Sequence, residues 1–481
     1  MTSRLITGSK EVIMAIPVWG QWHTDMLLDI CLPSMLFPEN IPAFAKLHNC
    51  TIHIYTREKE LEKIENSKSV QELKRFVRVN IDTSVLERVE GTNPVNHYLG
   101  WNHATELAIA CDGYVWNMLP DVVFADGALR YLAQRLHEGY YSLMWFYPRV
   151  TSNTFVPAAI KAIREAPDGA ISPREMVKLS LLHFHPTMAA YFIDSPHFPK
   201  HAELLMRAVK GQGIAARMMI NVNNIFDPQK FLLSEQNLTV GKFDPSTIHF
   251  VTDSDDLFAV SLAPLGKDSI WYRHAGPQRN METALWWLQF DGSANDFIAS
   301  QHIRLHTNDI DERDWIPVER VLDLRIRKVA VLREAFRLLT YFEDLALPGM
   351  ATLLSLLIAS GVLIKLIGKY DRFLILVPKS LDLDTIQDRF SNVSNVHSNF
   401  DLLRRHLVPL PDDVDVLNIE DIVQTRLSLL SGENLMVTYT KDVRLTINGI
   451  LAETEVRHLF NQRLIFLEGE IPESGQAFDA S

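Results

Sequence analysis

The sequence predicts an α/β fold, with a mostly parallel sheet flanked by helices, followed by a C-terminal, mainly helical α+β domain. Two observations lead to this prediction. Over roughly the first 150 residues, short apolar runs rich in β-branched residues alternate with amphipathic helical stretches. Beyond about residue 318, the pattern changes to long helices. We therefore expect two domains, spanning residues 1–315 and 318–481.

The overall composition is that of a folded protein. The chain has 481 residues, of which 47% are hydrophobic and 22% charged. Its net charge of −12 argues against a nucleic-acid partner, because binding a phosphate backbone requires a concentrated Lys/Arg surface. Three cysteines without C-x-x-C spacing, and an N-terminus without a signal-like apolar stretch, predict a cytoplasmic location.

The elements can be justified in chain order. Strands are expected over residues 12–18, 51–55, 77–81, 114–118, 141–147 and 248–251. Helices are expected over residues 58–76, 98–111, 155–165, 173–182, 200–210 and 282–290, and Asp126 is expected to cap one more. Because strands alternate with helices, neighbouring strands should run parallel and be joined by crossover helices. A small β portion is expected near residues 436–447.

One apolar segment leaves several alternatives open. Residues 345–364 contain no charge and reach the length of a membrane span, but Pro348, Gly349 and Thr352 make their hydrophobicity modest. A buried core helix is favoured over peripheral membrane contact or a true span. The C-terminal third could accordingly form a homo-oligomer, bind an acceptor, or hold the protein at a membrane.

The expected strand ends carry groups suited to ligand binding. Open α/β sheets bind ligands at the carboxyl edge of their strands, so residues that follow the strands should converge there. The candidates at this edge are Pro17, Val18, Trp19, Thr56, Arg57 and Asp121.

The stretch YLGWNHATELAIACDGYVWNMLPDVVFADGALRYL, residues 98–132, resembles a segment of the GT-A glycosyltransferases. In that family a helix carrying G-x-N precedes an apolar strand and the acidic D-x-D motif. The resemblance extends over residues 11–150 by strand order and is sharp over 100–132. It implies a GT-A-like sheet that binds a nucleotide-diphosphate sugar as donor. Asp121 matches the last aspartate of D-x-D, which binds Mn²⁺ or Mg²⁺, whereas Leu119 stands at the first position.

The same resemblance implies roles for other residues. Val18, Trp19 and Thr56 would line the nucleoside pocket, and Asn102 would face the ribose or diphosphate. GT-A enzymes often bring a late histidine to the metal, and His306 is a candidate by location.

The catalytic groups are less clearly marked. Asp253, in an acidic cluster at 253–256 after an apolar run, and His185 are the candidate catalytic residues. The acidic cluster is also an alternative metal or acceptor site.

These observations predict a glycosyltransferase that moves a sugar to a carbohydrate, lipid-linked or protein acceptor. The alternative is a non-catalytic nucleotide-sugar-binding or scaffold protein on a degenerate GT-A fold. A nucleotidyltransferase is disfavoured, because it should have a Gly-rich, basic loop after the first strand, and residues 18–23 have neither feature.

Overall fold

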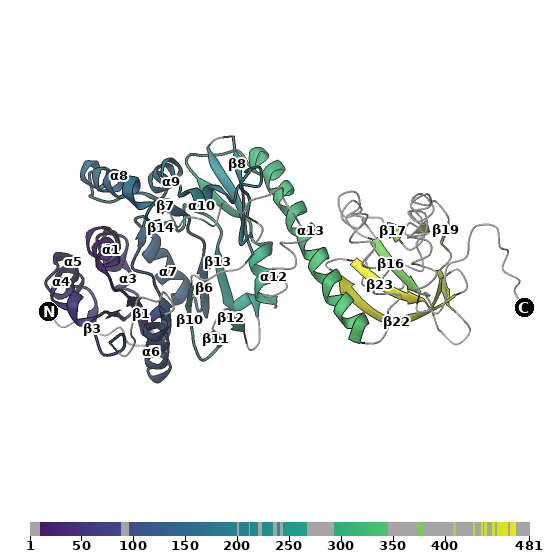
Figure 1. Ribbon diagram of the computed structural model, residues 1–481, viewed down its shortest axis with the longest axis horizontal. Helices are drawn as coiled ribbons and strands as arrows, with labels where there is room; N and C mark the ends of the chain where they lie inside the picture. Colours follow the sequence, from purple (N-terminus) through teal and green to yellow (C-terminus); the bar gives the residue numbers. More distant parts are fainter. Residues whose placement is uncertain are drawn as a thin grey trace, which may run out of the picture. The chain divides into compact units, whose positions relative to one another are not determined.

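The computed structural model describes residues 10–87, 96–199, 202–210, 212–219, 224–233, 238–240, 244–266 and 293–344, and strands within residues 373–467. The chain divides into two compact units. The first contains the described residues up to Leu322, and the second those from Asp323 on. Figure 1 shows the elements of both.

The first unit is built on a seven-stranded sheet with the order β13-β6-β10-β4-β1-β2-β3. Its strands are β1 (Val12–Pro17), β2 (Cys50–Tyr55), β3 (Arg78–Asp82), β4 (Tyr114–Asn117), β6 (Ser142–Trp145), β10 (Asn224–Phe226) and β13 (Ile248–Val251). All run in one direction except β10, which is antiparallel to both of its neighbours. The predicted α/β fold with a mostly parallel sheet is therefore confirmed.

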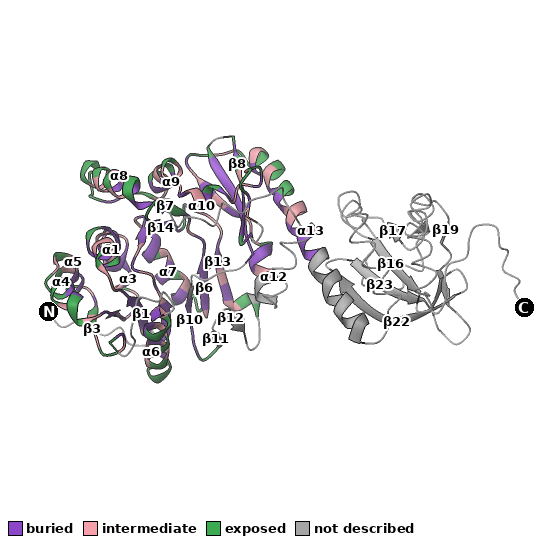
Figure 2. Cartoon of the chain, viewed as in Figure 1, coloured by how far each residue is buried: buried purple, intermediate pink, exposed green. Residues whose placement is uncertain are grey.

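Helices cover both faces of this sheet. The described helices that lie wholly in the first unit are α1 (Gln21–Met26), the π-helix η1 (Leu27–Cys31), α2 (Leu32–Met35), α3 (Ile41–Phe44), α4 (Glu58–Glu65), α5 (Lys68–Leu73), α6 (His97–Ala110), α7 (Ala128–His137), α8 (Ser152–Glu165), α9 (Pro173–Leu182), α10 (Pro186–Ala189), the 3₁₀ turn η3 (Pro245–Thr247) and α12 (Ser293–Ser300). Ile13 of β1 packs in one apolar cluster with Ala104 of α6, whereas Met14 packs in another with Leu129 of α7. Successive residues of a strand face opposite sides, so both faces of the sheet are buried, as Figure 2 shows for β6 and β13.

A three-stranded sheet continues the large one. It consists of β5 (Val122–Phe124), β7 (Arg149–Thr151) and β14 (Ala259–Ala263), in the order β5-β14-β7. β5 follows β4, β7 follows β6, and β14 follows β13, each after a short connection. These three connections therefore all leave the carboxyl edge of the large sheet.

Two local expectations are wrong. Residues 204–209 form strand β8 (Leu204–Val209), not a helix. β8 pairs with β9 (Gly213–Met218), which also pairs with β15 (Ile303–His306). This long-range pairing overrides a local pattern that also fits a helix. Asp126 does not cap α7; Gly127, with φ 87°, occupies that position, and Asp126 Oδ1 accepts a hydrogen bond from the Glu39 backbone N–H (2.9 Å).

The remaining elements complete both units. The first also has the hairpin β11 (Phe231–Leu233) and β12 (Leu238–Val240). α13 (Glu312–Asp344) begins in the first unit and continues into the second. The described strands of the second unit are β16 (Phe373–Pro378), β17 (Leu407–Pro409), β18 (Leu427–Ser428), β19 (Asn434–Leu435), β20 (Val437–Tyr439), β21 (Leu445–Ile447), β22 (Ile450–Leu459) and β23 (Gln462–Leu467).

Two expected segments, 282–290 and 345–364, lie outside the described residues. The β portion expected near residues 436–447 contains the antiparallel pair β20 and β21. Among the helices that the structure describes, none is long and apolar enough to cross a bilayer.

Gly100 lets α6 approach the ends of β1 and β2 closely. A Cβ atom at this position would lie 2.8 Å from Tyr55 Cδ2 and 3.0 Å from Pro17 Cγ, closer than side chains tolerate. The absence of a side chain at Gly100 therefore fixes how near α6 lies to the carboxyl edge.

Gly100→Val should reduce the free energy of unfolding by about 1–3 kcal/mol, because the added methyl groups overpack this contact. Urea denaturation followed by circular dichroism measures the change. Glu106→Val is the matched control, since Glu106 is exposed on the same helix. The control should cost only about 0.5 kcal/mol of helix propensity, and equal effects of the two substitutions would contradict the packing argument.

Candidate functional site

The strand order reverses beside β1. The chain passes from β1 to β2 and β3 on one side, and then returns to place β4 on the other. In open α/β sheets, ligands bind outside the carboxyl ends of the strands at such a reversal. Here the two strand ends are Pro17 and the 118–121 connection. α6 lies over both, since Gly100 approaches Pro17 and Trp101 Nε1 donates to the Met118 carbonyl (3.4 Å).

Several predicted site residues lie along this edge. The backbone N–H of Val18 donates to the Tyr55 carbonyl (2.8 Å), and that of Thr56 donates to the Asp82 carbonyl (2.9 Å). Val18 and Thr56 are buried, and Trp19 is half-buried. The hydrogen bonds between consecutive strands thus continue one residue beyond β1 and β2, and bring these residues to one edge.

Two further predicted residues lie on the helices at this edge. Arg57 precedes α4 and is half-buried, and Asn102 lies in the first half of α6 with an exposed side chain. Arg57 therefore follows the end of β2, while Asn102 belongs to the helix that approaches Pro17.

Among the described residues, four buried oxygen atoms on elements next to these strand ends have no hydrogen-bond partner. They are Thr24 Oγ1, Thr56 Oγ1, Glu60 Oε2 and Asn117 Oδ1. Glu60 is tied to the connection after β1, because its Oε1 accepts from the Gly20 backbone N–H (3.0 Å). Buried polar groups are normally satisfied, so such a group of oxygens indicates a place where water or a ligand completes the hydrogen bonding.

Asp121 lies at the end of the connection from β4 to β5. Its side chain is half-buried, and Oδ2 accepts a hydrogen bond from Ser261 Oγ (3.3 Å). The Asp121 carbonyl accepts from the Leu262 N–H (2.8 Å), which fixes the backbone to β14. Burial raises the pKa of Asp121 to about 6, although Arg149 and Ser261 act in the opposite direction.

Arg149 is a candidate site residue that the sequence analysis missed. It begins β7, and Ser261 of β14 pairs in register with Arg149 on one side and Val122 on the other. The Arg149 side chain is exposed, and within the described part of the chain it makes no hydrogen bond or ion pair. Its positive charge lowers the pKa values of Asp121 and Glu203 against the effect of burial. The strand-end rule, applied to the expected strand 141–147, would have found it.

His185 has a structural position. It precedes α10, and its Nδ1 accepts a hydrogen bond from the Thr187 backbone N–H (3.3 Å). Its own backbone N–H donates to the Arg149 carbonyl (3.0 Å). Both the residue and its Nε2 atom are buried, and burial lowers the pKa of the imidazole. The structure therefore uses His185 to cap a helix and to support β7.

His306 lies with Asp253 rather than with Asp121. Its Nε2 lies 3.2 Å from Asp253 Oδ2, and both ring nitrogens are buried. The carboxylates that raise the pKa of His306 are those of Asp253 and Asp255. Burial raises the pKa of Asp253, but the hydrogen bonds from His306 and from the Asp255 N–H lower it by more. The net shift of the Asp253 pKa is therefore downward.

The donor set at Asp121 limits which metal it could hold. Among the described residues, no group of three or more His, Cys, Asp or Glu side chains is arranged to hold a metal ion. A single carboxylate suits Mg²⁺ or Mn²⁺ bound mainly by phosphate oxygens and water. Asp121 therefore fits a metal that arrives with a phosphate ligand.

Asp121→Asn and Asp253→Asn should change stability in opposite directions. The folded protein disfavours ionised Asp121, so stability is lost as the pH rises from 3.8 to about 6, and Asp121→Asn should raise the unfolding temperature most above pH 6. Because its pKa is lowered in the folded protein, Asp253 stabilises the fold above pH 3.8. The pKa of its partner His306 is raised, so His306 stabilises the fold below pH 6.5, and this stabilisation is lost as the pH rises above that value. Asp253→Asn should therefore lower the unfolding temperature at pH 6. Calorimetry at pH 4.5, 6 and 7.5 measures both, and the same sign for the two variants would contradict these assignments.

The site at the carboxyl edge can also be compared with known proteins. A comparison with models of protein families and with curated proteins finds no match. The functional argument therefore rests on the reversal of strand order, on the half-buried Asp121 and on the unpaired Arg149.

Proposed function

We propose that this protein is a glycosyltransferase of the GT-A type that binds a nucleotide-diphosphate sugar at the reversal point between β1 and β4. The observation that carries the proposal is the unpaired, exposed Arg149 near the half-buried carboxylate of Asp121 at this edge. An exposed guanidinium that makes no hydrogen bond or ion pair among the described residues can attract an anionic ligand, and its fork of donors matches phosphate oxygens.

The chemistry of sugar transfer requires these charges. Departure of a nucleoside diphosphate builds negative charge on its phosphate oxygens, and fixed positive groups that receive it stabilise the transition state. Arg149 would donate hydrogen bonds to the diphosphate. Asp121 would hold Mg²⁺ or Mn²⁺, which would supply further positive charge to the same oxygens.

The remaining edge residues would bind the nucleoside. The half-buried Trp19 ring offers a flat apolar surface after β1, beside Pro17 and Val18. Thr56 Oγ1 and Asn117 Oδ1 are buried without hydrogen-bond partners and could accept hydrogen bonds from a base or ribose. Arg57 and Asn102 would contact the ribose or diphosphate.

Glu203 is the candidate base that would take the proton of the acceptor hydroxyl. Glu203 is exposed, and burial of its carboxyl group raises the pKa although the charge of Arg149 lowers it. In contrast, Nδ1 of His185 caps a helix, the His185 residue is buried, and Asp253 is paired with His306. Glu203 therefore suits the role better than either residue proposed from the sequence. The acceptor would be a carbohydrate, a lipid-linked sugar or a protein.

The donor site can be tested by titration calorimetry with UDP-glucose and GDP-mannose as probes. At least one should bind, and Arg149→Met should weaken its binding by tenfold or more, because a charged hydrogen bond to phosphate is lost. Arg320→Met is the control, since it removes the same charge from an exposed position on α13. Equal weakening by both variants, or no binding of any probe, would contradict the proposal. Slow hydrolysis of the bound donor would distinguish an enzyme from a non-catalytic binding protein.

The contribution of Mn²⁺ should depend on pH. Since the pKa of Asp121 is about 6, roughly a tenth of the carboxyl groups are ionised at pH 5. We therefore expect Mn²⁺ to strengthen binding of the preferred nucleotide sugar about tenfold less at pH 5 than at pH 7.5. The sugar-linked diphosphate does not titrate in this range, so the change reports the protein. Asp121→Asn should remove the Mn²⁺ effect at both pH values, and a retained effect would exclude Asp121 as the ligand.

A further inference from the structure

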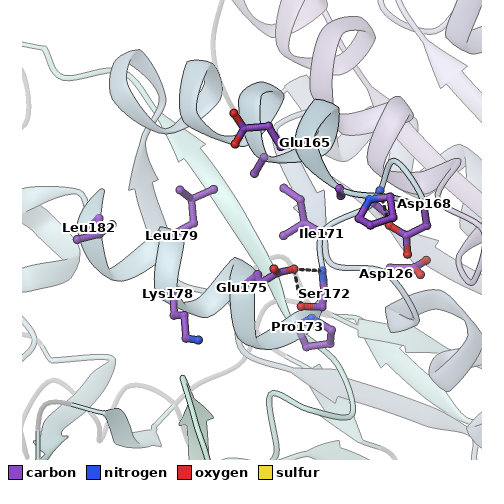
Figure 3. Close-up of a pocket in the computed structure, with 14 residues that line it drawn as sticks. Asp126, Glu165, Asp168, Ile171, Ser172, Pro173, Glu175, Lys178, Leu179 and Leu182 are labelled. Carbon is purple, nitrogen blue, oxygen red and sulfur yellow. Dashed lines mark hydrogen bonds between the residues drawn. The ribbon is translucent and has the colours of Figure 1, made fainter.

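A pocket of about 590 Å³ lies between α8 and α9, beyond the end of β5 that is remote from Asp121. Asp126, just after β5, contributes to its wall, whereas Asp121 immediately precedes β5. The pocket is therefore separate from the donor edge, and Figure 3 shows the residues that line it. Its volume falls within the range of small-molecule sites.

The pocket is fixed by hydrogen bonds. The chain turns between the two helices at Gly169, whose φ of 69° favours glycine. The Asp126 backbone N–H donates to the Ile171 carbonyl (2.8 Å), which ties this turn to the end of β5. Ser172 and Glu175 form a capping box that starts α9. The walls are thus held by secondary structure and its caps.

The charge of the lining is strongly negative. Four carboxylates line the pocket against one ammonium group, that of Lys178. Glu175 is engaged in the capping box, and Glu165 lies 3.8 Å from Lys161. Asp126 and Asp168 make no ion pair within the described residues, although each accepts a backbone hydrogen bond. Burial raises the pKa of Asp126, and the negative charges of Glu39 and Asp168 raise it further.

The opposite side of the pocket carries two leucines, and Lys178 lies on the same side in Figure 3. Figure 3 shows Leu179 and Leu182 away from Asp126 and Asp168. Leu182 is 78% exposed, so its side chain is accessible to a ligand in the pocket. Ile171 lies between the two ends in this view and is buried. The pocket therefore has one anionic end and one end where two leucines lie on the same side as Lys178.

We infer that this pocket binds an amphiphilic aliphatic amine. The ammonium group would lie against Asp126 and Asp168, which make no ion pair among the described residues, and the alkyl chain would cover Leu179 and Leu182. Ion pairing and burial of apolar surface then act on the same ligand. This inference does not depend on the proposed sugar transfer, because the lining shares no residue with the donor edge.

Hexylamine, hexan-1-ol and hexanoate test the inference, because they share a six-carbon chain and differ in charge. Titration calorimetry should show saturable binding of hexylamine to the full chain, with at least fivefold weaker binding of the other two. Hexylamine should also bind more tightly than ethylamine. Binding of hexanol or hexanoate as tight as that of hexylamine would overturn the inference, as would no hexylamine binding at all.

Two substitutions locate the binding. Asp168→Asn keeps the acceptor for the Ala170 N–H but removes the charge, and should weaken hexylamine binding about three- to tenfold at low salt. Leu182→Ser changes an exposed side chain, and should weaken hexylamine binding while leaving ethylamine binding unchanged. Glu62→Gln, an exposed residue of α4, is the control for loss of one negative charge. If Asp168→Asn and Leu182→Ser bind hexylamine as tightly as the Glu62→Gln control does, the amine lies elsewhere and the inference is wrong.

Discussion

The parallel pairing of β1 with both β2 and β4 is the constraint on which the rest of the first unit depends. Parallel strands cannot be joined by tight turns, so the chain must return across the sheet through helices that bury both of its faces. Polar groups are then excluded from the strands and concentrate in the connections. Because all four strands from β4 to β3 run the same way, the connections that follow them leave from one edge.

This constraint explains how much of the fold could be predicted. The strands at residues 12–17 and 248–251 follow from apolar runs, because a buried strand needs such a run. The antiparallel strand β10 was not expected, and residues 200–210 were expected to be helical. Both errors concern segments whose state depends on partners far along the chain: β10 pairs with β4 and β6, and β8 pairs with β9, next to β15. Local periodicity does not contain that information.

Candidate site residues could be predicted where their position followed from the strand topology. They were harder to predict where they were chosen by residue type alone. Residues after β1, β2 and β4 were correctly expected to share an edge. His185 and His306 were selected because histidine often serves in catalysis or metal binding, but the fold gives one ring nitrogen of His185 to a helix cap and one of His306 to Asp253. Arg149 was overlooked although it also follows a strand. A sequence does not reveal which polar groups find partners within the protein, and this property separates Arg149 from the histidines.

The insertion of β14 between β5 and β7 has a mechanical consequence. Two strand spacings, about 10 Å, separate the backbone near Asp121 from that of Arg149. The intervening strand β14 keeps the backbones that carry Asp121 and Arg149 apart. The hydrogen bonds between β5, β14 and β7 therefore set the distance between these two opposite charges. A ligand that binds between Asp121 and Arg149 meets charged groups whose spacing is already fixed in the folded protein. Little reorganisation energy would therefore be needed when the ligand binds.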